Sequence, residues 1–242
     1  MSTFAIIIPC YNEDSRLKKN IFSRFLETHL DVKLFFVNDG STDNTLKIIE
    51  EIKHQSINQV QIINLPENIG KGESVRRGML EAIEQNQFDY IGYLDADLST
   101  SLDEYYELCT HAVHMNADFI FGSRIKKLGS FIKRSFLRHV IGRTVMTIVD
   151  QKFKLGYYDT QCGAKLFRAG VLETIIWQSF STKWFFDIEI FLRLRKKNKD
   201  YIGIEYPLKT WHNVGGSKLT LLSFSFVLKE IIILFSKYKN GE

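Results

Sequence analysis

The sequence predicts an α/β fold: a single, doubly wound and mostly parallel sheet flanked by helices, with a C-terminal amphipathic helical extension. Two observations predict it. Short apolar runs typical of buried strands alternate with segments whose apolar residues recur at helical spacing, and the connections between them are short and polar or glycine-rich. With 242 residues, 45% of them hydrophobic, the chain is long enough for one large domain with a buried core.

The first strand is expected at residues 4–9, a continuously apolar run closed by a proline. Further strands are expected at 34–37, 60–65, 90–94 and 118–122. Helices are expected between them, at 16–30, after 43, from 72 to about 85 and from 101 to about 115, the last beginning with a capping box of Ser101 and Glu104. Ligands bind at the carboxyl ends of strands in such sheets. We therefore expect the polar connections 10–14, 38–43, 66–72 and 95–100 to converge on one rim.

Asp95 and Asp97 follow the fourth strand and are separated by one residue. Two carboxylates placed in this way offer hard oxygen ligands and leave positions open for water and phosphate, which suits Mg²⁺ or Mn²⁺. Aspartates before a helix are often only caps, but the expected capping box already supplies that function. A phosphatase reading, in which the first aspartate is a nucleophile, lacks the helper lysine and further acidic residues that such sites need.

Two further connections offer groups that suit a nucleotide. The Asp39 carboxylate is placed either to accept hydrogen bonds from a nucleobase or to form a plain Asx turn. Around Lys71, two glycines and a helix N-terminus combine backbone amides with a flexible cation, and Arg76 follows one turn later, an arrangement that favours phosphate. It is neither a Walker loop nor a dinucleotide fingerprint, because Val75 stands where the third glycine is needed.

Residues 119–149 contain seven Lys or Arg and no acidic residue, with apolar residues interleaved at helical spacing. Such a segment suits an anionic membrane surface or a phosphorylated acceptor, and a solvated basic face over an ordinary core stripe remains the alternative. The net charge of +4 is too small to argue for nucleic acid, and no binding module accompanies the basic residues. We therefore expect no nucleic-acid partner.

The last third of the chain contains two polar clusters in apolar surroundings, residues 159–167 and 184–189. In the second, Asp187 lies beside three aromatic residues, so it is either buried and paired or active in chemistry. Residues 211–218 form a polar, glycine-containing loop that could close over a ligand. Residues 219–235 are strongly apolar but interrupted by Lys229 and Glu230, so we expect an interfacial helix or core packing and no membrane span.

The three cysteines are scattered and odd in number, which indicates neither a disulfide framework nor a zinc site and fits a reducing cytoplasm. The N-terminus runs directly into the first strand, so we expect no signal peptide.

Four motifs taken together resemble the inverting glycosyltransferase family 2, whose catalytic domain has the GT-A fold: IIIPCYNE at 6–13, VNDGSTD at 37–43, NIGKG at 68–72 and LDAD at 94–97. Later motifs resemble the branch of dolichyl-phosphate β-glucosyltransferases and similar polyprenyl-phosphate glycosyltransferases: KRS at 133–135, DTQCG at 159–163, KLF at 165–167, WFFDIE at 184–189, and Trp211 with GSK at 216–218. One departure is Ala164, where the branch has an aromatic residue.

The resemblance implies a UDP-sugar donor, with glucose as the expected hexose, and a polyprenyl or dolichyl phosphate acceptor. It also implies a divalent metal, Mg²⁺ or Mn²⁺, held by Asp97 and Asp95. The expected catalytic residues are Asp97 and Asp187. The nucleotide-sugar would contact Pro9, Tyr11, Asn12, Glu13, Asp39, Lys71, Arg76, Asp95 and Ala96. The acceptor and its phosphate would contact Arg124, Lys133, Arg134, Arg138, Gln161, Lys165, Trp211, Ser217 and Lys218.

By the same resemblance, the GT-A domain spans 1–218, with a nucleotide-sugar half to about 124 and an acceptor half from about 125, and 219–242 form a helical tail. We expect a cytoplasmic enzyme bound peripherally to the inner face of a membrane. An acceptor that is already an anion needs little help from a base. Two alternatives stay open: a glycan hydroxyl as acceptor, for which Asp187 is an essential base, and an inactive module that binds membranes or nucleic acid.

Overall fold

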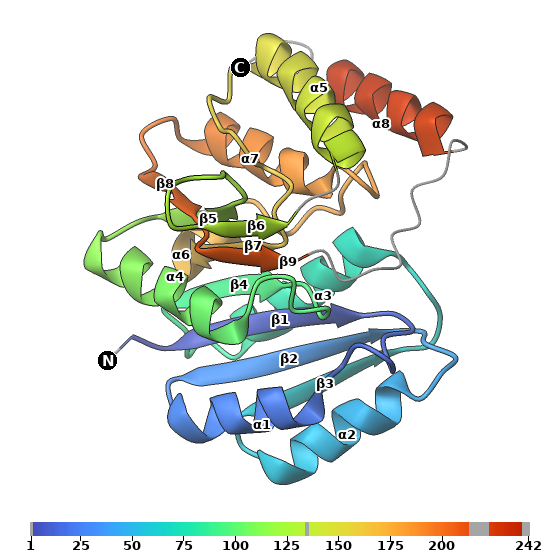
Figure 1. Ribbon diagram of the computed structural model, residues 1–242, viewed down its shortest axis with the longest axis vertical. Coiled ribbons are helices and arrows are strands. Elements are labelled where there is room, and N and C mark those ends of the chain that lie inside the picture. Colours follow the sequence, from blue (N-terminus) through green and yellow to red (C-terminus); the bar gives the residue numbers. More distant parts are fainter. Residues whose placement is uncertain (1, 134–135, 213–222, 239–242) are drawn as a thin grey trace.

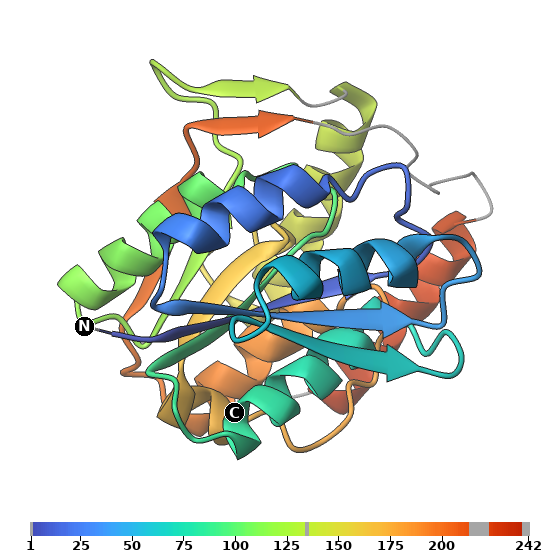
Figure 2. The same cartoon turned by 90° about the horizontal axis from the view of Figure 1, so that it is seen from below.

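The protein is built on one seven-stranded sheet, seen in a computed structural model that describes residues 2–133, 136–212 and 223–238 (Figure 1). The strand order is β3-β2-β1-β4-β7-β5-β8. The strands are β1 (Phe4–Cys10), β2 (Val32–Asp39), β3 (Val60–Leu65), β4 (Tyr90–Leu94), β5 (Phe119–Ser123), β7 (Ala164–Arg168) and β8 (Gly203–Pro207). A separate parallel pair, β6 (Phe131–Lys133) and β9 (Thr210–His212), stands off from the main sheet (Figure 2).

Helices cover both faces of the sheet, as the sequence predicts (Figures 1 and 2). One layer consists of α1 (Lys19–Thr28), α2 (Thr45–Gln55) and α4 (Leu102–His114). The other consists of α3 (Lys71–Glu84), α6 (Ala169–Glu173) and α7 (Phe186–Lys197), with α5 (Phe136–Phe153) and α8 (Ser223–Lys237) beyond them. Alternation along the strands explains the two layers, because successive side chains point to opposite faces. In β1, Ile7 packs into one core and Ile6 and Ile8 into the other.

The sheet is mostly parallel, and its exception matters for the site. Strands β1, β2, β3 and β4 are parallel, and β5 is parallel to β8. Strand β7 lies between β4 and β5 and is antiparallel to both. Because it runs in the opposite direction, its first residue, Ala164, pairs with Leu94 at the carboxyl end of β4. The polar segment before β7 is thereby brought to the rim where the parallel strands end.

The elements expected from the first half of the chain are present, with shifted ends. The first helix begins at Lys19 and not at residue 16, and β2 extends through Asp39. The capping box is only half confirmed: the Ser101 hydroxyl accepts from the Glu104 amide, as expected. The Glu104 carboxylate, however, turns away to accept the backbone N–H of Lys209 and Thr210, and so ties α4 to the segment before β9.

The apolar tail includes α8, which packs against the body of the protein. Ile231 and Leu234 join the core, and the rings of Phe235 and Phe153 meet at 5.3 Å between centroids. Ile232 on the same helix stays exposed. Within the described residues, no helix is both long and apolar enough to cross a bilayer. The boundaries expected at residues 124 and 218 remain predictions.

Candidate active site

The loops after β1 and β2 are joined by hydrogen bonds at the rim of the sheet. The amide of Asn12 donates to the Ser41 hydroxyl at 3.0 Å, and the Asn12 side chain accepts from the Thr42 amide at 2.9 Å. The Glu13 amide donates to the Thr45 hydroxyl at 2.7 Å. Asn12 adopts a positive φ of 53°, a conformation that asparagine tolerates better than most residues. The convergence expected for these loops is confirmed by their contacts.

Asp39 joins the loop after β2 to the loop after β3. It is 2% exposed, and its carboxylate accepts the amides of Ile69 at 2.8 Å and Gly70 at 3.0 Å and the Asn68 side chain at 3.1 Å. The Asp39 carboxylate is therefore neither free nor part of a plain Asx turn. Asp39 instead fixes the loop that precedes Lys71, and its expected contact with a nucleobase remains a prediction.

Lys71 and Asp95 form the centre of the site. The Lys71 ammonium lies 2.5 Å from the Asp95 carboxylate, so the N-terminus of α3 is joined to the end of β4. Desolvation would lower the pKa of Lys71, but the carboxylates of Asp95 and Asp187 outweigh it and raise that pKa. Gly163, just before β7, accepts the Asp95 amide at 3.0 Å, and a Cβ at Gly163 would come within 2.0 Å of the Asp95 carboxylate. A side chain at position 163 would therefore displace the Asp95 carboxylate.

Acidic groups accumulate around this pair. Burial, and after it the charge of Asp95, raise the pKa of Asp97 above its ordinary value. Burial also raises the pKa of Glu13 to about 7; its ion pair with Arg16 opposes this shift, and the charges of Asp97 and Asp95 add to it. Burial is the largest cause of both pKa shifts and the neighbouring carboxylates add to it; a bound cation would favour the ionised form of each group.

The donor set fits a divalent metal that takes most of its ligands from elsewhere. Within the described residues, no group of three or more His, Cys, Asp or Glu side chains is arranged to hold a metal by itself. Asp95 and Asp97 are both half-buried, and one Asp97 oxygen accepts the Ser99 amide at 2.9 Å. Mg²⁺ is commonly held by one or two carboxylates together with substrate phosphates and water. Asp97, with Asp95 beside it, therefore fits a metal that is completed by a diphosphate.

A buried ionic cluster lies beneath the rim. Lys165 is 0% exposed, and its ammonium lies 2.5 Å from the Asp187 carboxylate, 2.9 Å from the Tyr93 hydroxyl and 2.7 Å from the Cys162 carbonyl. The Tyr93 hydroxyl also donates to Asp187. Tyr93 and Lys165 are partners in the antiparallel register of β4 and β7, which places both side chains on one face. Asp187, in the first turn of α7, is thus paired with a cation, and Lys165 lies inside the protein with its ammonium engaged.

Arg124 follows β5 and is held by Asp159. Its Nε and one terminal nitrogen each donate to that carboxylate at 2.6 Å, and its backbone amide adds a third bond at 3.0 Å. Desolvation would lower the pKa of Arg124, but the Asp159 charge raises it. The guanidinium lies 5.3 Å from the ring centroid of Trp211 in β9, so the expected acceptor residues Arg124 and Trp211 are neighbours.

The remaining candidates occupy different environments. Arg76 is 6% exposed and bonds to Glu73 and to the carbonyls of Ile176 and Trp177, so its guanidinium serves packing in this structure. Lys133 is exposed at the end of β6, Gln161 is half-buried before β7, Pro9 and Tyr11 are half-buried beside the rim, and Ala96 is buried. Arg134, Ser217, Lys218 and the side chain of Arg138 lie outside the described residues.

Three residues around the site are not among the site residues that the sequence predicts. Tyr93 lies in an apolar strand run, although its hydroxyl joins the ionic cluster. Gly163 belongs to one of the motifs but has no predicted role. Phe186 packs against Gly72, where an added Cβ would lie 2.8 Å from its ring. The sequence offers one indication of a role for Tyr93: it carries a hydroxyl in a strand that is followed by two aspartates.

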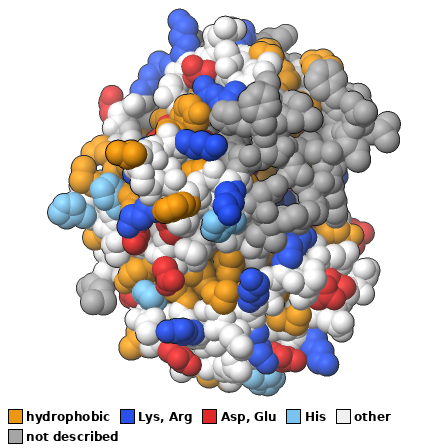
Figure 3. All heavy atoms as spheres, in the orientation of Figure 1, with side chains coloured by type: hydrophobic (Ala, Val, Ile, Leu, Met, Phe, Trp, Pro, Cys, Tyr) orange, Lys and Arg blue, Asp and Glu red, His pale blue; other side chains and the backbone are white. Residues whose placement is uncertain are grey.

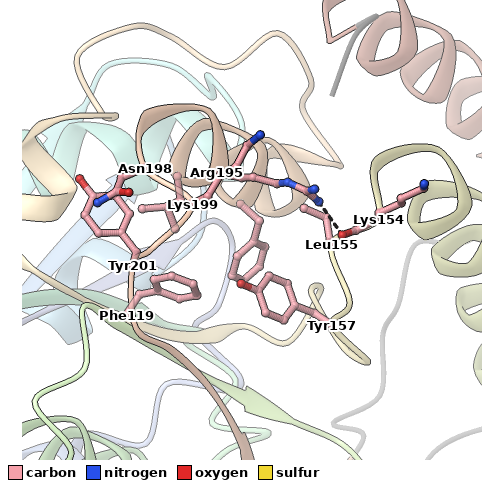
Figure 4. A pocket seen from close by; sticks show the side chains of 10 residues that line it. Phe119, Lys154, Leu155, Tyr157, Arg195, Asn198, Lys199 and Tyr201 are labelled. Carbon is pink, nitrogen blue, oxygen red and sulfur yellow. Dashed lines mark hydrogen bonds between the residues drawn. The ribbon is translucent and has the colours of Figure 1, made fainter. Parts of the chain in front are cut away.

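Two further surface features lie apart from this site. A hollow of about 220 Å³ opens at the other end of α7 from Asp187 (Figure 4). Its lining combines aromatic rings with basic side chains and includes none of the expected site residues: Phe119, Lys154, Leu155, Tyr157, Phe191, Leu194, Arg195, Asn198, Lys199 and Tyr201. On the face in Figure 3, the coloured Lys and Arg side chains are interspersed with Asp and Glu and form no single patch.

Comparison with known proteins identifies the family of this chain. Residues 5–176 match the sequence model of Glycosyl transferase family 2. A protein of Dictyostelium discoideum named dolichyl-phosphate beta-glucosyltransferase is 31% identical over 98% of this chain and 75% of its own length. The Saccharomyces cerevisiae protein of the same name is 30% identical, with the same coverage of both chains.

Solved structures agree in fold. Glucosyl-3-phosphoglycerate synthase from Mycobacterium tuberculosis, in complex with Mn²⁺, UDP and glucosyl-3-phosphoglycerate, has a TM-score of 0.69 at 14% identity, and the match covers 98% of this chain and 80% of that chain. Its complex with Mg²⁺ and UDP has a TM-score of 0.66 at 15% identity, covering 98% and 79%. The mostly parallel sheet flanked by helices is therefore the GT-A fold. From its sequence match, the chain belongs to glycosyl transferase family 2, a family of enzymes.

Proposed function

We propose that the protein transfers glucose from UDP-glucose to dolichyl phosphate or another polyprenyl phosphate, with inversion at the anomeric carbon. The observation that carries the proposal is the 31% match to a protein named dolichyl-phosphate beta-glucosyltransferase, which spans 98% of the chain and so includes both the donor loops and the segment before β7. The arrangement of charges at the rim supports the same chemistry.

The donor would lie across the carboxyl ends of β1, β2 and β4. The loop that Asp39 fixes presents Lys71 at the N-terminus of α3, where backbone amides and the helix dipole favour phosphate. The diphosphate would then take the place of Asp95 as the partner of the Lys71 ammonium, or share it. A UDP leaving group gains negative charge as the bond to the sugar breaks, and this cation stabilises it electrostatically.

A divalent metal would be held by Asp97 together with Asp95. When bound, it supplies a second positive charge to the leaving diphosphate. Burial, and after it the charge of Asp95, raise the pKa of Asp97, and a bound cation would favour its ionised form.

The acceptor would enter from the side of β7 and β9. Arg124, held by Asp159 and stacked on Trp211, is a preorganised cation at that edge, and Lys133 is exposed nearby in the strand pair β6 and β9. Cations here would offset the cost of bringing an acceptor phosphate beside a diphosphate. Asp187 is paired with Lys165 and accepts a hydrogen bond from Tyr93, so its carboxylate is already engaged within the protein. An acceptor that is already ionised does not require a base.

The location follows from the substrates. A polyprenyl phosphate resides in a membrane and a UDP-sugar in the cytoplasm, so we place the protein peripherally on the cytoplasmic face. The basic segment 119–149 and the exposed apolar side chains of α8, such as Ile232, are the candidate contacts.

The test is direct. Purified protein is incubated with labelled UDP-hexoses, Mg²⁺ or Mn²⁺ and a polyprenyl phosphate, and the products are extracted into organic solvent. We expect a labelled lipid that requires the metal and is strongest with UDP-glucose. Absence of labelled lipid with every sugar nucleotide refutes the proposal.

The acceptor class is decided by Asp187→Asn. With a phosphate acceptor, this variant should retain measurable turnover. If the acceptor is instead a hydroxyl, whose proton a base must remove, the same change should abolish turnover.

A further inference from the structure

Glu230 is a buried acid in a mostly apolar helix, and its partners lie just before another helix. It is 3% exposed and lies in α8. One carboxylate oxygen accepts the backbone amide of Lys183 at 2.7 Å, and the other accepts those of Trp184 at 2.8 Å and Phe185 at 3.0 Å. These amides immediately precede α7, whose first residue is Phe186.

This contact anchors the chain where it enters α7. The helix begins at Phe186 and has no side-chain cap of its own, and the amides that Glu230 accepts belong to the three residues before it. A carboxylate at that end also interacts favourably with the helix dipole. Glu230 therefore fixes the entry to α7 although it is more than forty residues away in the chain.

A second set of contacts joins the same two helices. Lys237 of α8 lies 2.8 Å from Glu189 of α7 and 2.5 Å from the Ser181 hydroxyl. Glu189 is 0% exposed and also accepts from the Ser181 amide at 2.8 Å and from Arg193 at 2.9 Å. The segment 181–185 is thus fixed from both sides by buried carboxylates.

The fixed end of α7 reaches the candidate active site. Phe186 packs on Gly72, the residue after Lys71, so closely that an added Cβ would lie 2.8 Å from its ring. The next residue, Asp187, pairs with Lys165. The Lys71 ammonium lies 5.9 Å from the centroid of the Phe186 ring. A shift of the first turn of α7 would therefore move groups beside the donor phosphates.

We propose that α8 is a positioning element of the active site: through Glu230 it fixes the first turn of α7, and with it Phe186 against Gly72 and Asp187 beside Lys165. The kinetic part of this inference rests on the proposed function. Glu230 touches no substrate in this scheme, and it acts through α7.

The decisive variant is Glu230→Gln, with Lys229→Gln as its matched control. Glutamine has nearly the same shape, but it has one acceptor oxygen where three amides need two, and it carries no charge. Lys229 is exposed on the same helix. Hydrogen exchange is measured on the folded proteins by mass spectrometry, and lipid formation is measured with UDP-glucose and polyprenyl phosphate.

We expect Glu230→Gln to accelerate exchange at residues 183–188 and to lower kcat by about 10- to 100-fold, the order of effect that a misplaced site group produces. The KM for UDP-glucose should change by less than about threefold, because Asp39 holds the donor loop independently. Glu230→Asp keeps the charge and should recover part of kcat; it also serves as the test variant if the glutamine protein does not fold. Lys229→Gln should match the wild type in both measurements.

Unchanged exchange at 183–188, or faster exchange with an unchanged kcat, overturns the inference and leaves Glu230 with a role in stability only. A different result refutes the proposed function alone: the wild type forms no labelled lipid, while Glu230→Gln still accelerates exchange at residues 186–188 and at 71–73. In that case, the positioning of α7 stands without the substrates assigned to it.

Discussion

Replacing Lys165 with methionine tests whether the buried ionic cluster is the feature that fixes Asp187. Lys165 is 0% exposed and Asp187 is 5% exposed, so the substitution removes the ammonium paired with a buried carboxylate. Among the described residues, the Tyr93 hydroxyl then remains as its hydrogen-bond donor. Removing one member of a buried ion pair costs about 3–5 kcal/mol. For a domain of this size, that loss corresponds to a fall in Tm of roughly 6–20 °C.

The matched double variant separates charge from packing. Lys165→Met combined with Asp187→Asn removes both charges and keeps an oxygen that can accept from Tyr93. Because a buried ion pair can be replaced by neutral groups at little cost, we expect the double variant to regain more than half of the lost stability.

Urea unfolding of the wild type, both single variants and the double variant measures this cycle. Lys152→Met is the control, since Lys152 is an exposed lysine in α5. A loss of less than about 1 kcal/mol for Lys165→Met, or simple addition of the two single effects, would refute the reasoning.

Three other outcomes follow from the geometry of the rim. Asp97→Asn should lower kcat by about 100-fold or more and abolish the metal-dependent thermal shift with UDP. If the variant retains both its kcat and the thermal shift, Asp97 is not a metal ligand. Gly163→Ala should weaken UDP binding by about tenfold in calorimetry, because its Cβ would lie 2.0 Å from the Asp95 carboxylate, and unchanged binding would contradict this. Glu13 has a folded pKa of about 7, against 4.5 as its ordinary value, so the unfolded chain loses this proton first and stability falls as pH rises from about 4.5 to 7. In urea unfolding measured across this pH range, Glu13→Gln should remove that loss, and equal pH dependence of both proteins would count against it.

The donor side of the site could be anticipated from the sequence because its information is local. The parallel strands of the first half are mostly apolar runs, and each is followed directly by its polar loop. Strand direction alone then places the loops after β1, β2 and β4 at one rim, and the contacts of Asn12 and Lys71 agree. The roles assigned to these residues in binding the nucleotide-sugar remain predictions.

The arrangement of the acceptor side depends on how β7 pairs with its neighbouring strands, and no local sequence pattern specifies this pairing. Lys165 was expected at the acceptor, but the antiparallel insertion of β7 turns it inward beside Tyr93. The same insertion brings Gly163 against Asp95. A five-residue strand between two parallel neighbours carries no sequence mark of its direction, so the sequence could not predict these contacts.

The sequence by itself determined the fold class, the order of strands and helices in its first half, and the two aspartates at the end of β4, because periodicity and short motifs act within single elements. Only the tertiary structure decided which charges meet: Lys71 with Asp95, Lys165 with Asp187, and Glu230 with the start of α7. Ion pairs between distant segments depend on strand order and helix packing, which are set by the burial of the whole core and not by any one stretch of the chain.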